Sequence, residues 1–242
     1  MLTEGRCTGY KQTGKHLVLY VCENVAAEVE QVVSNAQYDD VIVRSFAPLC
    51  GTSGSEQDVS SAIVGETGDV DVGFMCCHSY KAMLSAGEKR FYRIHDLKFC
   101  FQHVVNEAFY KYMVERGCYF VSSGELMNWH KRLSDLGYNQ KSAQAFYQEF
   151  YRELIYFDTG VVEGVQERLA RFAAFLGLPY RIFPANLQYM GNMIRSIVSE
   201  WRLHKKSQFY QGSLVKMRSQ SAEYRALVEL TEEMAVFTKR KD

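Results

Sequence analysis

Short apolar runs alternate with amphipathic segments along most of the chain. Consecutive apolar residues predict a buried strand, and apolar positions that recur every three or four residues predict a helix. Strands are predicted at residues 16–22, 41–46, 70–76, 118–121, 153–157 and 179–183, with another favoured at 97–101 in an ambiguous segment, 91–101. Helices are predicted at residues 24–33, 56–65, 81–89, 102–116, 125–151 with a break at Gly137, and 165–176.

Strands that alternate with helices favour an α/β fold with a mainly parallel sheet. We therefore predict a three-layer sandwich, Rossmann-like or flavodoxin-like, over residues 1–185. In such a sheet, ligands bind beyond the carboxyl ends of the strands. The residues that follow each strand are thus the first candidates for a functional site.

The pattern changes at residues 186–242, where apolar positions recur in steps of three, four and seven. These positions are Met190, Ile194, Ile197, Trp201, Leu214, Met217, Tyr224, Leu227, Leu230, Met234 and Phe237. One helix of about 50 residues would be about 75 Å long. Two interpretations stay open: a protruding helix that pairs with a second chain, or two helices that hinge near Gly212 and fold back. Residues 238–242 lack a helix cap, which predicts a downstream output domain.

Charge and composition exclude several classes of protein. Lys and Arg number 28, as do Asp and Glu, so the formal net charge is zero. No overall field therefore attracts nucleic acid or an acidic membrane. No apolar run is long enough to form a transmembrane helix, and the N-terminus shows no signal peptide. A cytoplasmic location is expected.

Seven cysteines all fall within the first 118 residues. Their odd number, without an export signal, indicates thiols rather than disulfides. Most of them end or follow a predicted strand, and parallel strands would gather them at one edge. We predict a soft-metal or iron–sulfur site there. Its candidate ligands are Cys22, Cys50, Cys76, Cys77, Cys118 and His78, with His103 in reserve.

The cysteines leave alternatives open. Cys118 begins its strand and fits the shared edge least well. The cysteines are also compatible with buried apolar thiols, or with a redox-reactive thiol that binds no metal.

Three polar residues extend the candidate site. Glu23 follows the first strand, and Asp158 and Thr159 follow the apolar run at 153–157. We expect these residues to contact a cofactor. The triplet Asp158-Thr159-Gly160 also occurs in aspartic proteases, but those need an all-β fold and a second carboxylate. The 16 Tyr and 15 Phe residues would also suit a tetrapyrrole, a corrinoid or a haem, as an alternative cofactor.

Several motifs resemble the domain-of-unknown-function family 1638. They are Val21-Cys22-Glu23, Ala47-Pro48-Leu49-Cys50, Phe74-Met75-Cys76-Cys77, Gly117-Cys118-Tyr119-Phe120, the segment 120–129, and the segment 154–160. The resemblance implies cysteines after the first and third strands and near the fourth, where Cys22, Cys76 or Cys77, and Cys118 stand. The family pattern has a His after the second strand, so Cys50 departs from it.

These observations predict a cytoplasmic sensory or ligand-binding module that forms a homodimer through its C-terminal helix. Its cysteine-ligated cofactor would pass a change of state through that helix to an output domain or partner protein. The resemblance implies an alternative: an enzyme or accessory factor of corrinoid-dependent methyl transfer, because genes of the family often neighbour such systems. The sequence shows no complete catalytic triad, which favours the non-enzymatic interpretation.

Overall fold

The computed structural model describes residues 16–48, 70–76, 91–96 and 99–220. The chain divides into two compact units, Met1–Val198 and Ser199–Asp242. Each unit is described by itself. The helices predicted at 56–65 and 81–89 lie outside the described residues.

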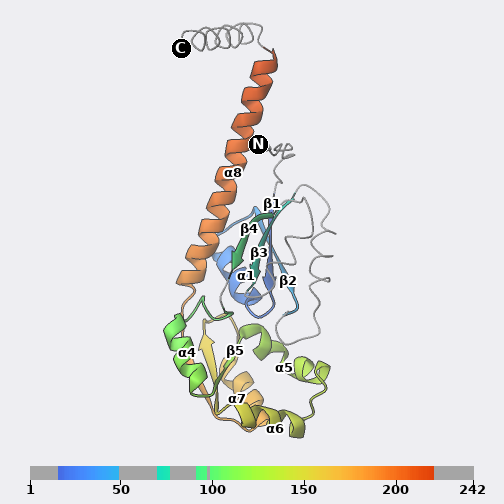
Figure 1. Ribbon diagram of the computed structural model, residues 1–242, viewed down its shortest axis with the longest axis vertical. Helices are drawn as coiled ribbons and strands as arrows, with labels where there is room; N and C mark the ends of the chain where they lie inside the picture. Colours follow the sequence, from blue (N-terminus) through green and yellow to red (C-terminus); the bar gives the residue numbers. More distant parts are fainter. Residues whose placement is uncertain (1–15, 49–69, 77–90, 97–98, 221–242) are drawn as a thin grey trace, which may run out of the picture. The chain divides into compact units, whose positions relative to one another are not determined.

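The first sheet contains four parallel strands in the order β2-β1-β3-β4 (Figure 1). They are β1 (His16–Cys22), β2 (Val41–Phe46), β3 (Val70–Cys76) and β4 (Phe91–Asp96). Six consecutive residues of β1 are buried, as expected for an inner strand that is covered on both faces. Helix α1 (Ala26–Asn35) connects β1 to β2 and buries Val29, Val32 and Val33.

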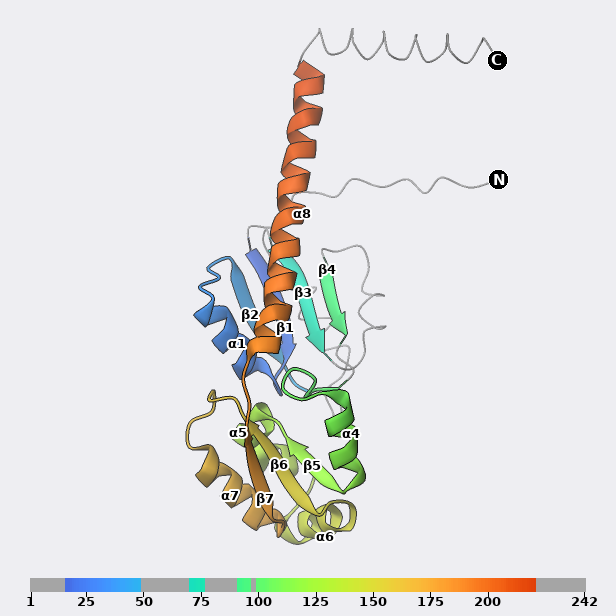
Figure 2. The same ribbon diagram turned by 90° about the vertical axis from the view of Figure 1, so that its left-hand side faces the viewer.

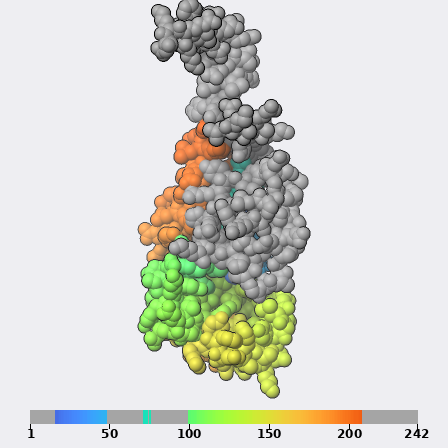
Figure 3. Space-filling view, viewed as in Figure 1, coloured from blue at the N-terminus to red at the C-terminus, as the bar shows by residue number. Residues whose placement is uncertain are grey.

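The second sheet contains three parallel strands in the order β5-β6-β7. They are β5 (Cys118–Val121), β6 (Glu153–Asp158) and β7 (Tyr180–Pro184). Four helices surround them: α4 (Glu107–Glu115), α5 (Ser123–Asp135), α6 (Gln140–Phe150) and α7 (Val165–Leu176). In the space-filling view, α4 in green and the α5–α6 pair in yellow-green form much of the visible surface of this part of the molecule (Figure 3).

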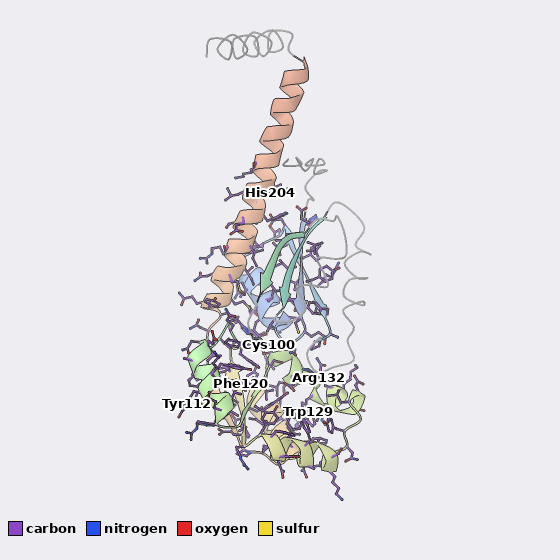
Figure 4. All side chains as sticks on the ribbon, in the orientation of Figure 1. Cys100, Tyr112, Phe120, Trp129, Arg132 and His204 are labelled. Atoms are coloured by element: carbon purple, nitrogen blue, oxygen red, sulfur yellow. The ribbon has the colours of Figure 1, made fainter. Side chains whose placement is uncertain are left out.

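Successive residues of β6 contribute to two different apolar layers. Leu154 and Tyr156 belong to the layer beneath α5, α6 and α7, whereas Ile155 and Phe157 belong to the layer beneath α4. Figure 4 shows Trp129 and Phe120, one from each layer. Since side chains alternate along a strand, a continuous apolar run produces this three-layer arrangement.

Side-chain caps fix where the helices of the second sheet begin. The Asn106 side chain accepts a hydrogen bond from the backbone N–H of Phe109 (2.8 Å), and Ser122 accepts one from that of Glu125 (3.2 Å). Asn139 and Ser142 form a reciprocal capping box at the start of α6. These caps satisfy backbone donors that would otherwise lack a partner.

The α/β class, the parallel pairing and the C-terminal helix are confirmed. The strands are divided between two sheets, however, because β4 and β5 are not paired. The strand favoured at 97–101 is wrong: β4 lies at Phe91–Asp96, and residues 99–105 form turns. The backbone N–H groups of Val104 and Val105 both bond to the Phe101 carbonyl in that segment.

Helix α8 (Gln188–Gln220) follows β7 and contains 33 residues. Met190, Ile194 and Ile197, all in the first unit, are buried. The helix continues unbroken through Gly212, where the sequence left a hinge open. Among the described residues, no helix is both long and apolar enough to cross a membrane.

Candidate functional site

The carboxyl ends of the first and second sheets face each other. In Figure 2 the arrowheads of β3 and β4 point toward the second sheet. At the second sheet, β5 ends directly before α5, and the first turn of α5 meets the loop that follows β1. A Cβ atom on Gly124 would lie 2.0 Å from the backbone oxygen of Glu23, so this approach requires glycine.

A small cavity lies where these strand ends meet. Its volume is about 10 Å³, which is room for about one water-sized group. Cys100, labelled in Figure 4, lies in the turn segment that forms one side of this junction. The cavity is lined by Asn24, Glu28, Phe101, His103, Val104, Val121, Ser122, Ser123, Tyr156, Phe157 and Thr159.

Glu28, in the first turn of α1, is the buried acid of this cavity. Its side chain is 3% exposed, and Oε1 accepts a hydrogen bond from the Ser123 hydroxyl. Ser123 Oγ also lies 3.0 Å from the Tyr156 hydroxyl. Burial raises the pKa of the Glu28 carboxyl, and the hydrogen bond from Ser123 opposes that rise to a smaller extent. Burial also raises the pKa of Tyr156 to about 12, so Tyr156 remains a donor.

His103 brings a neutral imidazole to the same cavity. It is 4% exposed, and burial lowers its pKa to about 4. The ring donates a hydrogen bond to the backbone carbonyl of Cys100. Its Nδ1 atom is buried and has no hydrogen-bond partner among the described residues. We therefore assign the proton to Nε2, which leaves a lone pair on Nδ1.

Three residues were expected to contact a cofactor. Thr159 lines the cavity, and its buried Oγ1 has no hydrogen-bond partner of normal geometry among the described residues, although it lies close enough to Glu28 to lower that carboxyl's pKa. Asp158 ends β6, and its Oδ1 accepts a hydrogen bond from the backbone of Gly160 (2.9 Å). Glu23 has an exposed side chain, and its backbone contacts Gly124. The structure brings Thr159 into the cavity lining. Asp158 precedes Thr159 in sequence, and Glu23 precedes the lining residue Asn24.

A second polar network supports the cavity from α5. Arg132 Nη1 donates to Asn24 Oδ1 (2.9 Å), which ties α5 to the loop after β1. On the same helix, Glu125 Oε1 accepts a hydrogen bond from the Tyr119 hydroxyl (2.5 Å). Burial and the charge of Glu125 raise the pKa of Tyr147 to about 12. These contacts fix the start of α5, and with it Ser122 and Ser123.

The predicted metal ligands are placed only in part. Cys22 is buried at the end of β1, and Cys76 ends the adjacent strand β3. Both residues lie one position beyond the register pair Val21↔Met75, so their backbones are neighbours at one edge of the sheet. The other three predicted ligands of this edge, Cys50, Cys77 and His78, lie outside the described residues.

Cys118 lies at the amino end of β5, whereas the cavity lies at the carboxyl ends of the strands. It is the first residue of β5, about 13 Å along the strand from Ser122. Its Sγ atom lies 4.0 Å from Glu153 Oε2. Burial and the nearby charge of Glu153 raise the pKa of this thiol, which disfavours the thiolate form that ligates metals. In the described part of the chain, His, Cys, Asp and Glu form no group of three that could hold a metal ion.

Sequence reasoning missed Glu28, Ser123 and Tyr156. One signal was present, because Glu28 occupies the apolar face of its helix, three residues after Val25 and one before Val29. A carboxylate on a buried face is rare unless it is paired. Ser123 and Tyr156 gave no comparable signal, since a Ser after a strand usually caps a helix.

Comparisons with known proteins identify a family. A family model described as "Protein of unknown function (DUF1638)" matches residues 21–194. The match covers most of the chain, including every residue that lines the cavity. No curated protein matches the chain.

Proposed function

The chain belongs to the DUF1638 family, and on that premise we propose that it is a ligand-binding module of the sensory kind. Its ligand or cofactor binds where the carboxyl ends of the two sheets meet, and α8 passes the bound state to a partner. The cavity carries this proposal. Glu28, His103 and Thr159 all line it, and each has a buried polar atom without a hydrogen-bond partner of normal geometry among the described residues.

Buried polar atoms without partners point to a ligand because they cost free energy. Most buried polar groups in proteins are hydrogen-bonded, and a buried polar group that lacks its hydrogen bond costs about 1–3 kcal/mol. Three such atoms around one cavity would be costly unless something binds there. The position agrees with parallel sheets in general, which bind ligands at the carboxyl ends of their strands.

A cysteine-ligated cofactor is part of the proposal. Support comes from Cys22 and Cys76, which end neighbouring strands in register at the same edge. Thiolates so placed suit an iron–sulfur cluster or another soft metal, and a tetrapyrrole is the alternative. An enzymatic role in corrinoid-dependent methyl transfer stays a prediction.

The connection between the strand ends and α8 supports the proposed relay. The backbone N–H of Ala185 donates to the Asp158 carbonyl (2.9 Å), which ties the segment after β7 to the end of β6. Helix α8 begins three residues later and extends for 33 residues, about 50 Å. A helix that starts beside a ligand site is a rigid element whose position two ligand states can bias.

The test is to purify the full chain without oxygen and to weigh it by native mass spectrometry. We expect an adduct that is lost on denaturation, with a visible absorption spectrum and metal content if the cofactor contains a metal. Cys22→Ser should then lower occupancy of a metal cofactor, and His103→Gln should lower occupancy of a ligand in the cavity. Cys118→Ser is the matched control, since Cys118 lies at the far end of β5.

A bare polypeptide mass, together with a colourless and metal-free protein, would contradict the proposal. So would equal occupancy in the Cys22→Ser, His103→Gln and control variants.

A further inference from the structure

We infer that the cavity binds an ammonium group, either the ammonium ion or the head of a primary alkylamine, on Glu28 Oε2, His103 Nδ1 and Thr159 Oγ1. This inference rests on the proposed function, because it names the chemical class of the ligand. It depends on four features of the cavity: its free acceptors, its charge, its helix termini and its size.

The three free atoms match the donors of an ammonium group. A carboxylate oxygen and the lone pair of a neutral imidazole both accept hydrogen bonds. Thr159 Oγ1 also accepts when its own proton is directed to Glu28, which it is close enough to influence. A primary ammonium group carries three N–H donors and no acceptor. One such group carries a donor for each of the three atoms that lack a partner of normal geometry in the described residues.

Charge also favours a cation. Lys111, Lys131, Arg171 and Arg181 form ion pairs with carboxylates other than Glu28. Arg132 lies beside the cavity residue Asn24, but it donates to the amide oxygen of Asn24. A buried carboxylate needs a counter-charge or a proton. A bound ammonium group supplies that counter-charge.

An anionic ligand fits the cavity less well. The first turns of α1 and α5 both lie at this junction, and helix N-termini attract anions. Each of these turns already holds a carboxylate, Glu28 in α1 and Glu125 in α5. Ser122 caps α5 with its own side chain. At α5 the Ser122 side chain therefore already engages one of the donors that an anion would use, and at α1 the carboxylate of Glu28 would repel an anion.

The size and the walls of the cavity agree with a small cation. A volume of about 10 Å³ admits one water-sized group, and an ammonium group is of that order. The remaining walls are Phe101, Val104, Val121 and Phe157. Aromatic faces attract cations.

The test is isothermal titration calorimetry on the full chain at constant ionic strength, after removal of any bound ligand by dialysis. The probes are ammonium chloride and ethylammonium chloride, with sodium chloride and zinc chloride as comparisons. Saturable binding of both ammonium probes indicates the shared head group. Tighter binding of ethylammonium identifies the alkylamine, whereas binding of ammonium alone identifies the free ion.

Variants locate the bound group. Glu28→Gln removes the negative charge of the carboxylate and should weaken ammonium binding at least about tenfold, since hydrogen bonds between charged groups are stronger than those between neutral groups. His103→Phe should also weaken it, because the free lone pair is lost. Glu30→Gln, an exposed site on the same helix, is the matched control and should bind as the wild type does. Circular dichroism checks that each variant is folded.

Three results would overturn the inference. They are no saturable binding of either ammonium probe, binding of zinc alone, and ammonium binding that Glu28→Gln leaves unchanged. These results separate the inference from the proposed function, because native mass spectrometry reports any bound ligand. If the bound species is not an amine, the proposed ligand-binding function stands and the ammonium site is wrong. If the protein carries no bound species, both proposals are wrong.

Discussion

Glu28 and His103 are both buried around one cavity, and burial moves their pKa values in opposite directions. The Glu28 carboxyl has a raised pKa and the His103 imidazole a lowered one, because burial disfavours the charged form of each. Burial therefore favours the neutral form of each group. Both groups therefore link folding stability to pH, with opposite signs.

His103→Gln tests the imidazole. Its pKa falls from 6.5 to about 4 on folding, so the folded state binds fewer protons in that interval. Stability is complete above pH 6.5 and should fall by about 3 kcal/mol as the pH drops toward 4. The Gln variant cannot titrate and should lack this loss. Urea unfolding at a series of pH values measures it, and an unchanged slope in the variant would contradict the assignment.

Glu28→Gln tests the carboxyl with the opposite sign. Its pKa is raised above the usual 4.5, so the folded state keeps its proton longer than the unfolded chain. Stability should therefore decline as pH rises above 4.5, until the folded carboxyl has also ionised. The difference in unfolding free energy between Glu28→Gln and wild type should grow over that range. Glu30→Gln, exposed on the same helix, should give a profile parallel to that of the wild type.

At the scale of elements, the contact between α5 and the loop after β1 holds the two sheets together. It consists of the close approach of Gly124 to Glu23, the hydrogen bond from Ser123 to Glu28 and the bond from Arg132 to Asn24. All of these contacts lie in the first three turns of α5 or in the turn that starts α1. The position of α5 therefore decides whether the cavity forms.

Gly124→Ala should disturb that contact. Its Cβ atom would lie 2.0 Å from the Glu23 backbone oxygen and 2.7 Å from the carbonyl carbon, and backbone atoms cannot turn aside. We expect a loss of about 1–3 kcal/mol in unfolding free energy. Gly191→Ala is the control, since a Cβ atom built at Gly191 meets no atom of the described residues within 4 Å. In the helix interior it should add up to about 1 kcal/mol. Equal effects of the two substitutions in urea unfolding would refute the close contact.

Strands and helices were well predicted where the apolar pattern was long. The bounds predicted for β1, β2, β3, β5 and α7 match the structure. Within the segment 91–101, the strand was assigned to the wrong half. Apolar residues occur both in the true strand β4 and in the turns that follow it, so the apolar pattern did not distinguish the two. The absence of strand pairing between β4 and β5 was not predictable, since the apolar pattern of a strand does not specify which strand it will hydrogen-bond to.

For the whole molecule, the C-terminal apolar stripe predicts that the chain pairs with a second copy. Its positions from residue 221 onward lie outside the described residues, so dimer formation stays a prediction from the heptad-like spacing. A charge in the seam of a paired helix is costly, whereas the same charge on the outer face is not.

The double substitution Leu227→Glu and Leu230→Glu tests this pairing. The wild-type chain should sediment as a dimer, and the variant as a monomer of 27.9 kDa. Arg225→Glu, between positions of the stripe, is the control and should remain dimeric. Analytical ultracentrifugation distinguishes these outcomes, and a monomeric wild type would falsify the dimer.

The amino-acid sequence by itself determined the local features of this protein. Apolar runs and capping residues specify strands and helices, because these depend on neighbours a few residues apart. Parallel strands then bring Cys22 and Cys76 to one edge, as the pattern predicted.

The tertiary structure alone decided the cavity. Ser123 and Glu28 are 95 residues apart in sequence, yet they share a hydrogen bond because α5 meets the start of α1. Burial, which sets the pKa values of Glu28 and His103, is likewise a property of the packed molecule and of no single segment. No local pattern encodes which polar atoms two packed sheets will leave without a partner.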